Sequence, residues 1–228
     1  MHLRYTSVLE SHPGSPRLAA KVTSSLRAAR VTVGDGAVAL DAPGVGLTGE
    51  WRARGTPAEE TILASPAGEV RWSCLQPRSA VSLHLRGEAL AGDGYLEHLL
   101  VTIPPWELPL RELRWGRFHG GDRVAVWIDW RGPHERRVGI LDGARVAASA
   151  SDAEVTLGDA RLELGERHVL RTGPLGTTAL RGIPVLGDRL PARMLAVDET
   201  KWLCRGRLSS PGATAVDGWC VHEVVRWP

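Results

Sequence analysis

The stretch Val124-Ala125-Val126-Trp127-Ile128-Asp129-Trp130-Arg131 alternates between two kinds of side chain. Val124, Val126 and Ile128 form one apolar series, and Ala125, Trp127 and Asp129 form a second, mixed one. Successive side chains of a β-strand point to opposite faces, so this period of two predicts a strand with two different faces. The same period recurs in segments 81–86 and 219–227.

Turn signals separate the alternating segments. Asp-Gly pairs occur at four points, and those at 35–36 and 142–143 lie between short apolar runs, as a two-residue hairpin requires. With 26 glycines and 15 prolines among 228 residues, few uninterrupted windows of helical length remain. Helix signals are few; among them is the capping-box pattern Thr56-Pro57-Ala58-Glu59, which could open a short helix. Together these features predict an all-β protein.

Composition and charge exclude several classes of protein. The formal charge is only +2, with 28 basic and 26 acidic residues spread along the chain, which removes the electrostatic basis for a nucleic-acid binder. The sequence has no run of 18 apolar residues and no apolar stretch at its start, so we expect no transmembrane segment, no signal peptide and a cytoplasmic location.

The cysteines and histidines predict no metal site and no disulfide. Cys74, Cys204 and Cys220 are odd in number and lack the spacing of a zinc knuckle, so we expect reduced, buried thiols. The eight histidines show no pairing at metal-ligand spacing. We therefore expect neither a metal nor an organic cofactor.

An internal repeat suggests two related modules. Trp72-Ser73-Cys74 is followed by Asp93-Gly94-Tyr95, and Trp202-Leu203-Cys204 is followed by Asp217-Gly218-Trp219. Two such similar pairs of elements, so far apart, predict two β modules at 1–131 and 132–228, joined near Gly132-Pro133. The role of residues 1–30 within the first module is left open.

The segments Asp93-Gly94-Tyr95-Leu96-Glu97-His98 and Leu113-Arg114-Trp115-Gly116-Arg117-Phe118 resemble motifs of the lipocalin-like carotenoid hydratase family, the hydroxyneurosporene synthase and AttH-type proteins. In that family a Gly-Tyr-x-Asp-x-Asn strand precedes a Trp-x-Trp-Gly/Ser-Arg strand. The family's Asp falls on Glu97, its Asn on Leu99 and its first Trp on Leu113. The resemblance implies two tandem lipocalin-like antiparallel β-barrels packed together.

The resemblance also implies a function. Hydratases of this family add water to an isolated carbon–carbon double bond of a long isoprenoid without a cofactor, and others in the wider group act as cyclases. The chain is then expected to act on an apolar isoprenoid or polyketide-like substrate by acid-assisted hydration or cyclisation. A pericyclase that uses the same pocket, a non-catalytic binder of a hydrophobic small molecule and a structural module with filled barrels stay open, as does a homodimer.

Glu97 is the expected acid. Protonating an alkene needs a carboxyl group that apolar surroundings keep neutral, and Glu97 shares a strand face with Tyr95, Leu99 and Val101. Tyr95 and His98 are expected to support it, although His98 points to the opposite face. The alternatives are that this face is a barrel exterior or that an arginine pairs with Glu97.

Asp129 is the expected second carboxylate. If the Trp127 face points inward, Asp129 could pair with Glu97 and position water; otherwise it is a solvated Asp beside Arg131. Glu223, which lies among apolar neighbours in segment 219–227, echoes Glu97 through the repeat, shifted by two residues.

Four further residues are expected to bind substrate. Trp72, Trp115 and Trp127 could line a hydrophobic slot and stabilise a carbocation through the faces of their rings, although core packing is the alternative for each. Arg117 could orient a substrate carboxylate or hold Glu97 ionised, and the second outcome would remove the acid role.

Overall fold

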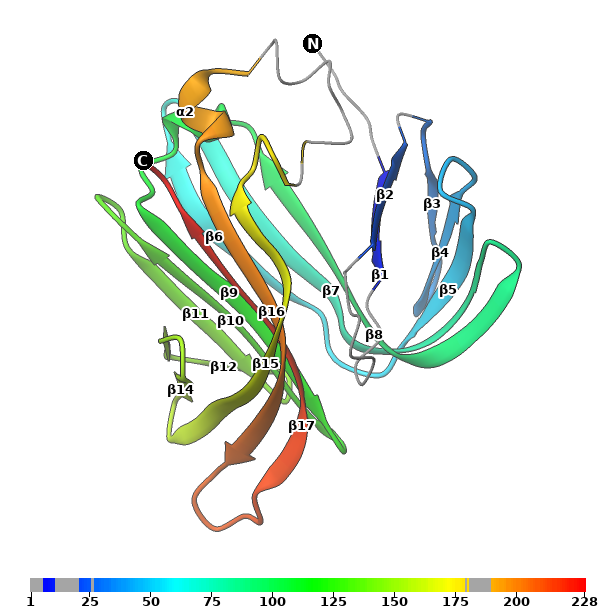
Figure 1. Ribbon diagram of the computed structural model, residues 1–228. Helices are drawn as coiled ribbons and strands as arrows, with labels where there is room; N and C mark the ends of the chain where they lie inside the picture. Colours follow the sequence, from blue (N-terminus) through cyan, green and yellow to red (C-terminus); the bar gives the residue numbers. More distant parts are fainter. Residues whose placement is uncertain (1–5, 11–20, 26, 179, 181–189) are drawn as a thin grey trace.

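The computed structural model describes residues 6–10, 21–25, 27–178, 180 and 190–228. Within these residues, regular structure is almost entirely β (Figure 1). The described helical segments are the 3₁₀ turn η1 (Pro105–Glu107) and the short helix α2 (Ala192–Leu195). The predicted all-β class is confirmed.

A nine-stranded antiparallel sheet forms the larger layer, with the order β12-β11-β10-β9-β17-β16-β15-β14-β13. It curls until β10 and β11 lie against β13, which nearly closes a barrel. Its strands are β9 (Glu112–Gly120), β10 (Arg123–Arg131), β11 (Arg136–Leu141), β12 (Ala144–Val146), β13 (Ala148–Ala150), β14 (Glu154–Leu157), β15 (Ala160–Pro174), β16 (Asp198–Ser209) and β17 (Val216–Arg226).

A second sheet of six strands lies beside the first (Figure 1). Its long strand β7 pairs with β8 along one edge, whereas β6 and β5 share the other edge. The strands are β3 (Arg30–Val33), β4 (Ala37–Ala42), β5 (Leu47–Ala53), β6 (Ala58–Ser65), β7 (Gly68–Leu85) and β8 (Glu88–Val101). A separate ribbon consists of β1 (Thr6–Glu10) and β2 (Lys21–Ser25).

Local signals placed two turns correctly and one helix wrongly. Asp142 and Gly143 both have positive φ, at 51° and 85°, in the tight turn between β11 and β12, and Gly36 has φ 65° in the turn between β3 and β4. The capping box at Thr56–Glu59 begins no helix, because residues from Ala58 onward form β6 and pair with β7. Pairing that buries Ile62 outweighs the local capping signal.

The two sheets divide earlier in the chain than the expected junction near Gly132-Pro133. β9 and β10 precede that junction, yet they belong to the nine-stranded sheet because β9 pairs with β17. The chain passes from one sheet to the other in segment 102–111. Each sheet does contain one copy of the repeat as a strand pair, β7 with β8 and β16 with β17. A duplication, and folding units at 1–131 and 132–228, stay predictions.

Both faces of β10 are buried, but in different cores. Val126, Ile128 and Trp130 pack against the six-stranded sheet, in a cluster that includes Val70 and Trp72. Ala125 and Trp127 point into the nine-stranded barrel, which Phe118 and leucines of β14 to β16 fill. The three cysteines are free and buried, as predicted. In the described part of the chain, no helix has the length and apolar character needed to cross a bilayer.

Candidate functional site

An apolar cavity of about 400 Å³ lies between the two sheets. The six-stranded sheet contributes Trp72 and Glu97 to its wall, and the nine-stranded sheet contributes Trp115 and Glu223. Alternation along the strands explains this convergence, since the same face of β9 and β10 that packs on β7 carries Trp115, Ile128 and Trp130. The remaining wall consists of aliphatic, proline and tryptophan side chains and Lys201.

Glu97 is held by one of its two carboxyl oxygens. The Trp72 indole Nε1–H donates to Oε2 at 2.6 Å, and the Tyr95 hydroxyl donates to the same oxygen at 2.7 Å. Oε1 has no hydrogen-bond or ion-pair partner among the residues that the structure describes. Burial, followed by the charge of Glu97, raises the pKa of Tyr95, so the tyrosine keeps its proton and remains a donor.

Arg117 lies near Glu97 without touching it. Its guanidinium carbon is 4.8 Å from the centroid of the Tyr95 ring and 5.9 Å from that of Trp115. The two rings meet edge to face, with centroids 6.1 Å apart. No ion pair or hydrogen bond links Arg117 to Glu97 in the described part of the chain, so the direct clamp considered from the sequence is not formed.

Asp129 does not pair with Glu97, which corrects the sequence-based expectation. It is 0% exposed and lies on the barrel face of β10, away from the cavity. Arg131 Nη2 donates to its Oδ2 at 2.5 Å, the Ala150 N–H donates to the same oxygen at 3.0 Å, and Arg137 Nε lies 3.4 Å from Oδ1. Burial raises the pKa of Asp129, but these donors outweigh burial and the net pKa is lowered. The alternative of a solvated Asp is also wrong, because Asp129 joins β10 to β13.

Two other expected residues lie outside the cavity. Trp127 is 0% exposed inside the barrel, because alternation turns it away from Ile128 and Trp130. It therefore forms no slot with Trp72 and Trp115. His98 is exposed, on the face of β8 opposite to Glu97. The structure thus brings together Glu97, Tyr95, Trp72 and Trp115, whose functional roles stay predictions.

A second carboxylate does reach the cavity, and it is Glu223. Lys201 Nζ lies 2.7 Å from Glu223 Oε2, and Glu223 faces Trp115 across the β17–β9 ladder. Glu199, 2% exposed, continues the network to Arg171 at 2.8 Å. The alternating pattern of segment 219–227 indicated Glu223, but only the strand register brings Lys201 beside it.

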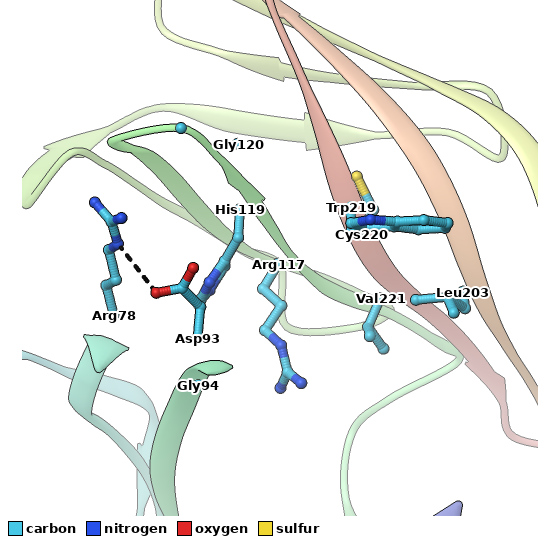
Figure 2. A pocket seen from close by; sticks show the side chains of 11 residues that line it. Arg78, Asp93, Gly94, Arg117, His119, Gly120, Leu203, Trp219, Cys220 and Val221 are labelled. Atoms are coloured by element: carbon cyan, nitrogen blue, oxygen red, sulfur yellow. Dashed lines mark ion pairs between the residues drawn. The ribbon is translucent and has the colours of Figure 1, made fainter. Parts of the chain in front are cut away.

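A second cavity, also of about 400 Å³, lies between the sheets and is more polar (Figure 2). Arg78 and Asp93 contribute to it from the six-stranded sheet, and Arg117, His119 and Trp219 from the nine-stranded sheet. Burial, with a further contribution from Arg117, lowers the pKa of His119 to about 4, so this imidazole is neutral at pH 7. The described residues contain no group of side chains arranged to hold a metal ion.

No protein-family model and no curated protein matches the chain. Solved structures do resemble it. Kievitone hydratase from Nectria haematococca superimposes with a TM-score of 0.57 at 11% identity, over 97% of this chain and 79% of that chain. A putative AttH from Nitrosomonas europaea gives 0.56 at 11% identity, over 96% and 80%.

A third similar structure is CghA with Sch210972, with a TM-score of 0.53 at 13% identity over 84% of this chain. The match spans 64% of the length of the CghA chain. At these identities the likeness shows the fold alone, and it confirms the predicted lipocalin-like fold. Membership of the carotenoid hydratase family and a homodimer stay predictions.

Proposed function

We propose that this chain is a cofactor-free enzyme that binds an apolar isoprenoid or polyketide-like molecule between its sheets and protonates a carbon–carbon double bond with Glu97. Hydration or cyclisation follows. One observation carries the proposal: a carboxyl group on the wall of an apolar cavity of about 400 Å³ has Oε2 fixed by two neutral donors and Oε1 unengaged. That volume suits a small organic ligand.

The hydrogen bonds of Glu97 fit a proton donor. In the protonated acid, Oε2 is the carbonyl oxygen that accepts from Trp72 and Tyr95, and the proton resides on Oε1. Transfer of that proton forms a C–H bond, breaks the π bond and leaves a carbocation. Part of the new carboxylate charge falls on Oε2, which already accepts hydrogen bonds from Trp72 and Tyr95. The site is therefore preorganised to stabilise the charge that develops.

The same cavity can stabilise and quench the cation. The rings of Trp72 and Trp115 lie on its wall, and an indole face attracts positive charge. In hydration, a water oxygen bonds to the cationic carbon and the surplus water proton returns the acid to its starting state. In cyclisation, a second double bond attacks instead, and loss of a proton from carbon restores Glu97. Glu223 is the carboxylate placed to orient water, in the role first expected of Asp129.

The names of two structural neighbours support this proposal. One is called a hydratase, and CghA is described together with the compound Sch210972. Both names concern those proteins. For this chain they favour a small-molecule enzyme over a structural module, as does a cavity that side chains leave open.

The test is proton transfer from solvent. A panel of isoprenoid and polyketide alkenes is incubated with the enzyme in D₂O, and products are analysed by mass spectrometry for carbon-bound deuterium. We expect wild-type enzyme to incorporate deuterium, and Glu97→Gln to lose at least a hundredfold in rate while it still binds the same compounds. Glu88→Gln, at the exposed start of the same strand, is the matched control and keeps full activity.

Other outcomes separate the alternative functions. A product without carbon-bound deuterium, formed equally well by Glu97→Gln, indicates a pericyclase that only folds its substrate. Binding without turnover across the panel indicates a carrier. Either result overturns the acid role of Glu97.

A further inference from the structure

Arg117 has no acceptor for its guanidinium N–H groups among the described residues. Several arginines of the nine-stranded sheet do have one: Arg114 binds Glu112, Arg123 binds Asp142, and Arg131 binds Asp129 and Glu112. Arg167 and Arg205 also make only ring contacts, but both are exposed, whereas Arg117 is half-buried. Arg117 makes only ring contacts, with Tyr95 and Trp115. A guanidinium has five N–H donors in a fixed fork, so Arg117, on the wall of the second cavity, can bind an anion there.

Arg117 forms no ion pair among the described residues, and the charge of Glu97 acts on it only across the Tyr95 ring. Figure 2 shows Arg117 extending into the second cavity beside Gly94, while Arg78 is drawn paired with Asp93 on the other side. Asp93 Oδ1 is 3.8 Å from Arg78 and 3.6 Å from Arg54, so two other arginines already neutralise this carboxylate. The cavity wall carries Arg78, Arg117 and one Asp, a net charge of +1.

His119 adds a buried ring nitrogen without a partner. Its Nε2 is buried and forms no hydrogen bond within the described residues. The ring is neutral at pH 7, as its lowered pKa requires, and its other nitrogen bonds the Pro77 backbone, so Nε2 can accept a hydrogen bond from a ligand hydroxyl without adding charge. A buried polar atom without a partner costs free energy, and a ligand that completes its hydrogen bond would recover it.

We propose that the second cavity binds the carboxylate, or a comparably delocalised acidic group such as an enolate, of an amphipathic substrate, with Arg117 as the anion anchor. A planar guanidinium fork matches the two oxygens of a carboxylate. This inference rests on the proposed function. It narrows the proposed substrate class to apolar molecules that carry one acidic group.

The position of Arg117 connects this anchor to the proposed acid. Its guanidinium lies on the Tyr95 ring, and the hydroxyl of that same ring holds Glu97 Oε2. One aromatic ring therefore separates the anion anchor from the carboxyl group. An acidic group bound at Arg117 would therefore lie against the ring that positions Glu97.

The test compares two probes that differ only in charge: dansyl-labelled undecanoic acid and its methyl ester, titrated by fluorescence. For wild-type protein we expect the acid to bind about tenfold more tightly than the ester, the size of one charge-assisted hydrogen bond. Arg117→Met should remove this preference by weakening only the acid. Arg117→Lys should keep part of it, since the charge remains and the fork is lost.

Arg205→Met is the matched control, because Arg205 also lies over a tryptophan ring, that of Trp219 at 4.5 Å. It should leave the preference unchanged. Equal affinity of wild-type protein for acid and ester overturns the proposal even if Arg117→Met fails to fold, and so does an Arg117→Met variant that weakens both probes equally. This experiment measures binding and not turnover, so the two proposals can fail separately. If the protein prefers the acid probe but transfers no deuterium, Arg117 is still the anion-binding residue and Glu97 is not the proton donor.

Discussion

The barrel interior and the space between the sheets each contain a carboxylate side chain, but the two carboxylates have different hydrogen-bond partners. Inside the barrel, Asp129 has donors on both carboxyl oxygens, including two arginines. Between the sheets, Glu97 has two neutral donors on one oxygen and none described on the other. Cations and the Ala150 N–H hold the pKa of the buried Asp129 carboxyl below its usual range, whereas the half-buried Glu97 has no cation in hydrogen-bond contact among the described residues.

The two regions also differ in how completely side chains fill them. The barrel is filled by Phe118, Trp127 and leucines, whereas about 400 Å³ stays open beside Trp72 and Trp115. The nine-stranded barrel is therefore the rigid support, and the second sheet leaves room against its outer face. This contrast makes separate predictions for the two regions.

Removing the negative charge of Asp129 should have the largest effect. The change Asp129→Asn keeps the side-chain shape but removes the buried charge at the β10–β13 contact, and it leaves Arg131 with Glu112 as its one remaining carboxylate partner among the described residues. We expect the free energy of unfolding, measured by urea denaturation, to fall by roughly 3–5 kcal/mol, as when one partner of a buried ion pair is removed.

Glu97→Gln is the same chemical change in the other region. It should alter the free energy of unfolding by less than about 1 kcal/mol, because Glu97 forms no ion pair with a described residue and the carbonyl oxygen of the new glutamine can still accept from Trp72 and Tyr95. If both variants lose similar stability, Glu97 is a structural residue like Asp129, and the contrast between the two regions fails.

The second prediction concerns pH, through His222 inside the barrel. His222 is 1% exposed, stacks on Trp202 at 5.5 Å, and has no hydrogen-bond partner for either ring nitrogen among the described residues. Burial, then the charge of Arg114, lowers its pKa from 6.5 to about 4, with Asp152 acting in the opposite direction. Its ring is therefore neutral in the folded protein at pH 7.

The sign of the effect follows from that pKa. Below pH 6.5 the His222 imidazole binds a proton in the unfolded chain, whereas in the folded chain it stays neutral down to about pH 4. The free energy of unfolding therefore falls as the pH falls through this window. The loss from His222 should reach about 3 kcal/mol at pH 4. Urea unfolding at pH 7 and pH 4 should show a smaller difference for His222→Phe than for wild type, whereas His98→Phe, at an exposed site, should keep the full difference. Equal differences for wild type and His222→Phe would contradict the assignment.

Sequence predicted the strands well because their signals are local. The period of two in 124–131 placed Trp127 and Asp129 on one face and Val126 and Ile128 on the other, as observed. It could not tell which face enters the barrel, because both faces are buried, one in each core. The misplacement of Asp129 and Trp127 follows directly from that ambiguity.

Contacts between distant segments have no local signal in the sequence. Gly132-Pro133 has the local character of a linker, yet sheet membership depends on β9 pairing with β17, about a hundred residues later. Lys201 meets Glu223 only through the register of β16 with β17. Glu97, Trp72 and Trp115 were grouped from motif resemblance, and the structure places them on one cavity wall.

Overpacking at Gly116 tests whether the barrel interior has any spare volume. A Cβ atom on Gly116 would stand 2.2 Å from Cζ2 of Trp127 and 2.6 Å from the Val221 carbonyl oxygen, so Gly116→Ala forces the indole or the β17 backbone to move. Overpacking of this kind costs about 1–3 kcal/mol, which a thermal or urea unfolding curve detects. Gly92→Ala is the matched control, because its Cβ would meet no atom within 4 Å. If Gly116→Ala is as stable as Gly92→Ala, then the barrel adapts to an added methyl group, and the open volume between the sheets no longer distinguishes that region as the site that binds a ligand.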